Sequence, residues 1–155
     1  MKKTNYLLFV FTLLLALSAC GTLRALDAKS FSDKMKEESY TIVDGLTQMN
    51  PAAKEKIKTS TIAISSDKSH QIEFYELLSD DIAVQMFNAN KDLFEKEKTK
   101  ESKIEASEKD HEYYKHTTKG RTYLISKIGS TILYANVEDK YSSQLDKMVK
   151  KLGYK

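Results

Sequence analysis

Residues 61–76, TIAISSDKSHQIEFYE, decide the fold class of this chain. Two runs rich in β-branched and aromatic residues lie on either side of the polar sequence SDKS, residues 66–69, which is typical of a turn. In the second run Ile72 and Phe74 alternate with polar residues and with Tyr75. Because successive side chains of a strand point to opposite faces, this alternation predicts a β-hairpin with one buried face and one solvent-facing side that carries Tyr75.

The same signals place the other elements along the chain. Helices are predicted at 28–38 after an N-cap at Asp27, from Asn50-Pro51 through Ile57, from Ser79-Asp80-Asp81 onward, and from Tyr141 to a stop at Gly153. Strands are predicted at 40–43, 61–64, 71–76, 113–117, 121–128 and 131–137. Residues 95–110 hold one strong hydrophobe, Ile104, and are predicted to form a fraying helix end followed by a mobile loop.

This order of elements predicts the α+β class, with an antiparallel sheet and amphipathic helices on one of its faces. It is compatible with two α-β-β-β units followed by a C-terminal helix. Residue identity between the two halves is weak, so the pattern alone does not establish a duplication. A doubly wound parallel sheet is disfavoured because single long helices do not join the strands throughout.

The amino terminus has the features of an export signal. Lys2 and Lys3 precede an apolar run at residues 6–17, YLLFVFTLLLAL. This run is shorter than the roughly 20 residues of a membrane-spanning helix and fits the h-region of a signal peptide. Leu17-Ser18-Ala19-Cys20 then ends the segment, and Cys20 is the only cysteine of the chain.

These four residues resemble the lipobox of bacterial lipoproteins, and each position matches. The resemblance implies that Cys20 carries a thioether-linked diacylglycerol with palmitate-type acyl chains and becomes the first residue after cleavage. The alternative is a small apolar residue in an ordinary signal peptide, or a free thiol. The expected organisation is a signal peptide at 1–19, a lipidated N-terminus and short linker at 20–26, and a single α+β domain at 27–155.

Composition excludes several classes of protein. Residues 1–19 hold two lysines and no acids, so the 25 basic residues fall to 23 in the mature chain, against 22 acidic ones. This balance gives no basic excess for a nucleic-acid partner. A single cysteine permits no intramolecular disulfide. Size, signal and Lys/Glu-rich style resemble the many small lipoproteins of Gram-positive bacteria whose roles are unassigned.

The sequence contains no motif for catalysis or for a metal. His111 and His116 are five residues apart on a predicted strand, which points them to opposite faces, and His70 lies at a hairpin edge. All three histidines are predicted to be solvated. The chain lacks the usual zinc, EF-hand, nucleophile-elbow and phosphate-loop patterns, and Asp80-Asp81 is explained by a helix start. No cofactor and no metal are expected, and the chain is not expected to be an enzyme.

Tyrosines are the remaining candidates for a functional surface. Tyr75, one of Tyr113 and Tyr114, and Lys115 are predicted to lie on the wet face of the sheet, where they could bind a partner. The alternative is that these tyrosines form cross-strand pairs that stabilise the sheet.

The sequence therefore predicts a membrane-anchored, extracytoplasmic, non-enzymatic binding or accessory module for a protein, a peptide or an envelope polymer. Two alternatives stay open. One is an inhibitor or immunity-type lipoprotein, by analogy of fold alone. The other is a hydrolase with a dispersed site, which would require a cleft with a histidine hydrogen-bonded to a carboxylate.

Overall fold

The computed structural model describes residues 24–107 and 111–155. The predicted signal peptide and Cys20 lie outside these residues. The elements in chain order are α2 (Ala28–Glu37), β1 (Thr41–Asp44), the 3-10 helix η2 (Leu46–Gln48), α3 (Pro51–Lys54), β2 (Ile57–Ile64), β3 (Gln71–Leu77), α4 (Asp80–Lys96), β4 (Lys103–Ser107), β5 (Glu112–Thr118), β6 (Arg121–Ile128), β7 (Thr131–Glu138), the 3-10 helix η3 (Asp139–Tyr141) and α5 (Ser142–Leu152).

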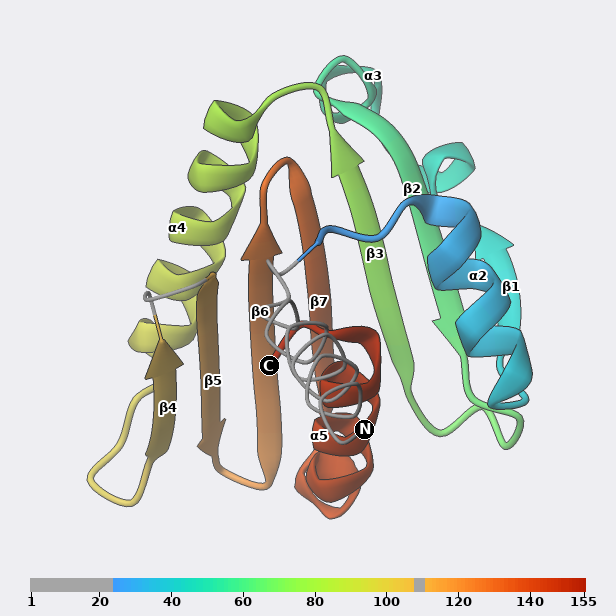
Figure 1. The fold of residues 1–155 in the computed structure, drawn as a ribbon. Coiled ribbons are helices and arrows are strands. Elements are labelled where there is room, and N and C mark those ends of the chain that lie inside the picture. The colour runs from blue at the N-terminus through green and yellow to red at the C-terminus, as the bar shows by residue number, and fades with distance from the viewer. Residues whose placement is uncertain (1–23, 108–110) are drawn as a thin grey trace, which may run out of the picture.

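One antiparallel sheet of seven strands, in the order β1-β2-β3-β7-β6-β5-β4, forms the centre of the molecule (Figure 1). The hairpin predicted from residues 61–76 is present as β2 and β3, with Ile62 opposite Glu73. β3 pairs with β7 and so joins the two halves of the chain into one sheet. The predicted α+β class with an antiparallel sheet is confirmed.

The predicted caps explain where the helices begin and end. The carboxylate of Asp27 accepts a hydrogen bond from the Ser30 N–H at 2.6 Å, and the side chains of Asn50 and Ser79 cap α3 and α4 in the same way. Gly153 ends α5 with a φ of 82°, which an L-residue adopts only at a cost. The predicted extension of the second helix, the one that starts at Asn50-Pro51, through Ile57 is wrong, because α3 ends at Lys54 and β2 begins at Ile57.

The prediction for residues 95–110 is wrong in one respect. α4 ends at Lys96, but residues 103–107 form the strand β4, which pairs with β5. Every residue of β4 is exposed, because it is the outermost described strand on that side of the sheet. Its alternation at Lys103, Ile104 and Glu105 is short and holds a single strong hydrophobe, which is why no strand was predicted there.

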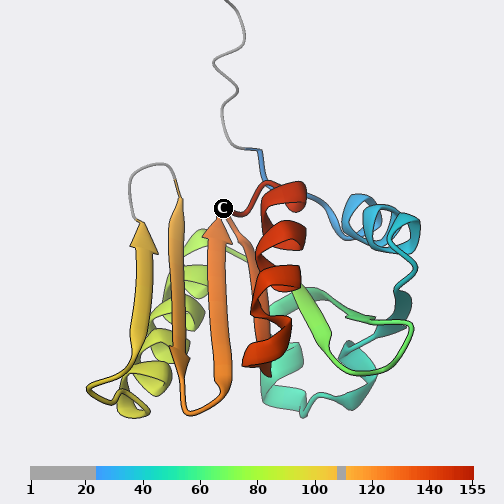
Figure 2. The ribbon, with the colours of Figure 1, turned by 90° about the horizontal axis from the view of Figure 1, so that it is seen from below.

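The helices lie on both faces of the sheet, so the prediction that they share one face is wrong. α2 and α5 pack against Ile72, Phe74 and Leu124, whereas α4 packs against Ile125 and Ile132 on the other side. Figure 2 shows α5 in front of the strands and α4 behind them. The physical reason is that β6 and β7 carry apolar side chains on both faces, and each face has to be buried. We call these the α2/α5 face and the α4 face.

This placement also bears on the suggested duplication. If the two halves were copies of one unit, the antiparallel pairing of β3 with β7 would relate them by a two-fold rotation about an axis perpendicular to the sheet. Such a rotation would place the helix of each half on the same face of the sheet. α2 and α4 lie on opposite faces, and the second half has four strands, so the halves are not a symmetric repeat of one α-β-β-β unit.

Candidate functional site

The residues predicted to form an open binding face are buried and divided between the two faces. Tyr75 and Tyr114 are 7% and 2% exposed and belong to the core under α4. Tyr113 is 4% exposed and lies in the core of the α2/α5 face, and Lys115 on the same face is 5% exposed. The prediction of a solvent-facing tyrosine surface is therefore wrong, because a helix covers each side of the sheet.

The two tyrosines of the α4 face bury their rings and bond through their hydroxyl groups. The Tyr75 hydroxyl donates to Glu73, and the Tyr114 hydroxyl donates to Glu95 at the end of α4. Burial raises the pKa of both phenols above its ordinary value, with the neighbouring carboxylates acting in the same direction. Both groups therefore remain protonated hydrogen-bond donors, which is a structural role.

Two of the three histidines are buried, which corrects the prediction that they are solvated. His116 is completely buried, with Nδ1 at 2.9 Å from the Phe94 carbonyl oxygen and Nε2 at 2.9 Å from Ser102 Oγ. His70 lies between the Tyr40 hydroxyl, 2.7 Å from Nε2, and Ser69 Oγ, 2.9 Å from Nδ1.

No histidine of the described residues bonds directly to a carboxylate. His111 contacts the carbonyl oxygen of Tyr154 near the end of α5, on the sheet face opposite to His116. Within residues 24–107 and 111–155 no cluster of three or more histidines or acids could hold a metal ion. The observation that would favour a hydrolase is not found in this part of the chain.

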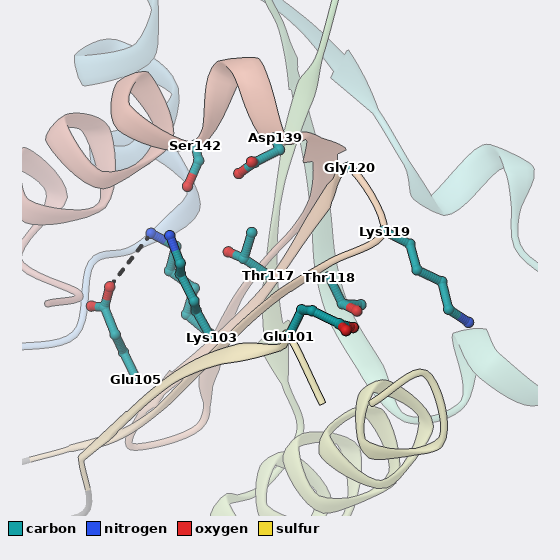
Figure 3. A pocket seen from close by; sticks show the side chains of 10 residues that line it. Glu101, Lys103, Glu105, Thr117, Thr118, Lys119, Gly120, Asp139 and Ser142 are labelled. Carbon is teal, nitrogen blue, oxygen red and sulfur yellow. Dashed lines mark ion pairs between the residues drawn. The ribbon is translucent and has the colours of Figure 1, made fainter. Parts of the chain in front are cut away.

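A groove beside the outer strands is lined largely by charged side chains. It has a volume of about 310 Å³ and runs between the edge of the sheet and the start of α5 (Figure 3). Its lining comes from β4, β5, the β5–β6 turn, η3 and the start of α5: Glu101, Lys103, Glu105, Lys115, Thr117, Thr118, Lys119, Gly120, Asp139 and Ser142. We call it the charged groove.

Strand register gathers these side chains on the α2/α5 face. Lys103 lies opposite Thr117, and Glu105 lies opposite Lys115. The buried Lys115 ammonium donates to Asp146 of α5 at 2.7 Å and lies 3.7 Å from Glu105. Two carboxylates thus hold one buried cation at the floor of the groove, as a charge removed from water requires.

Two charged side chains at the groove are left without a partner. Glu101 and Lys103 form no hydrogen bond or ion pair with another described residue. Lys119 points away from the other labelled side chains in Figure 3 and pairs with Glu97 at 3.3 Å. The groove therefore offers a free carboxylate and a free ammonium beside the hydroxyl groups of Thr117 and Ser142.

Of the residues that line this groove, only Lys115 was predicted from the sequence to lie on a binding surface. Lys103 and Glu105 fall in the segment predicted to be a loop, and Asp139 and Ser142 come from a distant part of the chain. The alternation Lys103-Ile104-Glu105 is the one local signal that could have indicated a strand there.

No protein-family model matches this chain, and no curated protein and no solved structure is significantly similar to it. Among the described residues, no helix is both long and apolar enough to cross a bilayer.

Proposed function

We propose that this protein is an extracytoplasmic lipoprotein, anchored through a diacylglyceryl group on Cys20, that binds a polar peptide in the charged groove without catalysing a reaction. The observation that carries the binding proposal is the pair of free, opposite charges, Glu101 and Lys103, at the rim of a hollow with a preformed floor.

The shape and chemistry of the groove support a peptide ligand. A volume of about 310 Å³ lies at the lower end of the range of ligand pockets. A peptide presents both ammonium and carboxylate groups, which Glu101 and Lys103 match, and its backbone amides match the hydroxyl groups of Thr117 and Ser142. The floor is preorganised, because Asp146 and Glu105 already hold Lys115 in place.

A lipid anchor would make even weak binding to a partner at the membrane effective. The linker predicted at residues 20–26 is short, so acyl chains on Cys20 would keep the domain close to the bilayer. Each buried methylene group contributes about 0.8 kcal/mol to membrane affinity, and two chains are enough for stable anchoring. Confinement to one surface raises the effective concentration for any partner on that surface.

The anchor is tested by Cys20→Ser. The wild-type chain should partition into detergent, and its first residue should carry the mass of a diacylglycerol. The variant should be released to the aqueous phase. An unmodified Cys20 in the native protein, or equal partitioning of the two chains, would contradict the proposed anchor.

The groove is tested with charge reversals at the two free residues. Glu101→Lys should weaken binding of peptides with a free amino terminus, and Lys103→Glu should weaken binding of peptides with a free carboxyl terminus. Each loss should be about fivefold, as expected for a partly exposed ion pair. The matched controls are Glu55→Lys and Lys54→Glu near α3, which make the same charge changes away from the groove.

The measurement is titration calorimetry of the full chain in detergent with short peptides whose ends are free or blocked. Soluble envelope polysaccharide is titrated in a parallel arm. If only the polysaccharide binds, or if the control variants lose as much affinity as the groove variants, a peptide site in the charged groove is wrong.

A further inference from the structure

β4 is an edge strand with one unused side. Among residues 24–107 and 111–155 it pairs only with β5, and each of its residues is exposed. Its other side therefore presents backbone N–H and C=O groups to which a further strand can bond. Ile104, at the middle of β4, is 38% exposed, which is unusual for a large apolar side chain on this molecule.

The sequence of β4 is complementary to itself when two copies run antiparallel. If Ile104 lies opposite Ile104 of a second copy, Lys103 lies opposite Glu105 of that copy, and Glu105 opposite its Lys103. Charged residues on an edge strand usually deter pairing, because like charges meet. In this register the opposite charges meet instead, twice, and the two exposed isoleucines cover each other.

Neighbouring registers lack this complementarity. Side chains that face each other must lie on the same face of the sheet, so the register can change only in steps that keep this parity. One step in either direction places Lys103 opposite Lys103 of the second copy, or Glu105 opposite its Glu105. The charges of β4 therefore select the register centred on Ile104.

We infer that β4 pairs with β4 of a second copy of this chain, antiparallel and centred on Ile104, to form one continuous sheet across a two-fold axis. The axis is perpendicular to the sheet, so both charged grooves open on the same side of the dimer. Ile104 lies opposite His116 in the β4–β5 register and so faces the α4 side, away from the groove. This inference does not rest on the proposed peptide ligand, and in the dimer Lys103 has a second partner, Glu105 of the other copy, beside its place in the groove.

Single cysteines placed along β4 of the full chain in membranes test both the pairing and its register. Opposite residues of an antiparallel pair have Cα atoms about 4.5–5.5 Å apart, which a disulfide can bridge. Ile104→Cys should therefore form a disulfide-linked dimer on mild oxidation. Two copies of position 103 or 105 are offset by two residues and lie roughly 8 Å apart, beyond that reach.

Lys103→Cys, Glu105→Cys and Ser107→Cys are therefore the matched controls, and the wild-type chain measures any crosslinking through Cys20. Dimer formation at 104 alone supports the inference. Equal crosslinking at all four positions, or none at 104, overturns it.

A second measurement is independent of added thiols. Sedimentation of the full chain in detergent should show a dimer that Ile104→Arg converts to a monomer, because two arginines then meet at the axis. Leu93→Arg places the same residue at another exposed apolar position, on α4, and should leave the dimer intact. A monomeric wild-type chain, or equal effects of the two substitutions, would overturn the inference.

Discussion

Two helices cover one face of the sheet and a single helix covers the other, and the side chains beneath them differ accordingly. The α2/α5 face is packed largely with aliphatic residues and phenylalanine, including Phe31, Phe74 and Leu145. The α4 face holds fewer buried residues, and four tyrosines lie on or beside its core: Tyr75, Tyr114, Tyr123 and Tyr134. The larger core of the α2/α5 face also has four, Tyr40, Tyr113, Tyr141 and Tyr154, so tyrosine makes up a greater share of the smaller core.

The difference follows from the dimensions of helices and strands. A helix is about 10 Å wide and neighbouring strands are about 4.8 Å apart, so one helix covers about two strands. α4 therefore leaves margins on its side of the sheet, where a side chain needs an apolar body and a polar end. Tyrosine meets both needs. The greater share of tyrosine in the core of the α4 face is thus explained by its single helix, rather than by an open binding surface.

The largest difference in stability between the two faces is expected when one buried phenylalanine on each face is replaced by alanine. Phe74 is fully buried on β3 and stacks on Phe31 with ring centroids 4.8 Å apart, whereas Phe94 is carried by the last turns of α4 and is 4% exposed. We expect Phe74→Ala to lower the free energy of unfolding by about 5 kcal/mol and Phe94→Ala by about 3 kcal/mol. Chemical denaturation measures both. Leu93→Ala, at a neighbouring site that is 56% exposed, is the control and should be nearly neutral. Equal losses at the two phenylalanines would contradict the comparison.

Removing a single tyrosine hydroxyl group from each face should give a smaller difference in unfolding free energy between the two faces. The Tyr114 hydroxyl donates to Glu95, whereas the Tyr113 hydroxyl on the other face is buried without a hydrogen-bond partner. Tyr114→Phe should therefore cost about 1 kcal/mol of unfolding free energy, while Tyr113→Phe should be neutral or slightly stabilising. Thermal unfolding of the two variants is the measurement. A larger loss at Tyr113 would show that its hydroxyl has a partner in solution.

The sequence was sufficient for the elements whose signals are local. The hairpin at residues 61–76 has a period of two between turn residues, and the caps at Asp27, Asn50 and Ser79 each need only a side chain three residues from an N–H group. These features depend on neighbours along the chain, and the structure confirms them.

The sequence was insufficient wherever burial depends on distant segments. Tyr75 alternates with Phe74 in the manner of a residue on a solvent-facing side, but α4, which follows β3 in the chain, folds back over that side of the sheet and covers it. β4 has the polar composition of an exposed segment because it is the outermost strand on its side of the sheet. The charged groove combines Lys103 with Ser142, which are far apart in the chain and are joined only by the sheet. Periodicity says which side chains share a face, but it does not say which face a helix will cover.

The smallest expected effect concerns the end of the α2/α5 face where the β2–β3 turn meets α5. His70 stacks on Tyr141 with ring centroids 5.0 Å apart and lies against Tyr40. Burial lowers the pKa of His70 below its ordinary value of 6.5, and the charge of nearby Asp67 opposes this change. Hydrogen bonds from Ser69 and Ser65 lower the pKa of Asp67 to about 2, so its carboxylate stays charged while His70 titrates.

A histidine with a lowered pKa in the folded state stabilises the fold above pH 6.5 and loses that contribution on acidification, because the unfolded chain binds the proton first. The melting temperature should therefore fall as the pH drops below 6.5, and His70→Gln should flatten this slope. His111→Gln, which removes the imidazole that contacts Tyr154, is the control and should leave the slope in place. If the slope were unchanged in His70→Gln, burial of His70 would not disfavour its protonated form. This margin of the α2/α5 face would then accept a charged side chain, as the margin of the α4 face does at Glu73 and Glu95.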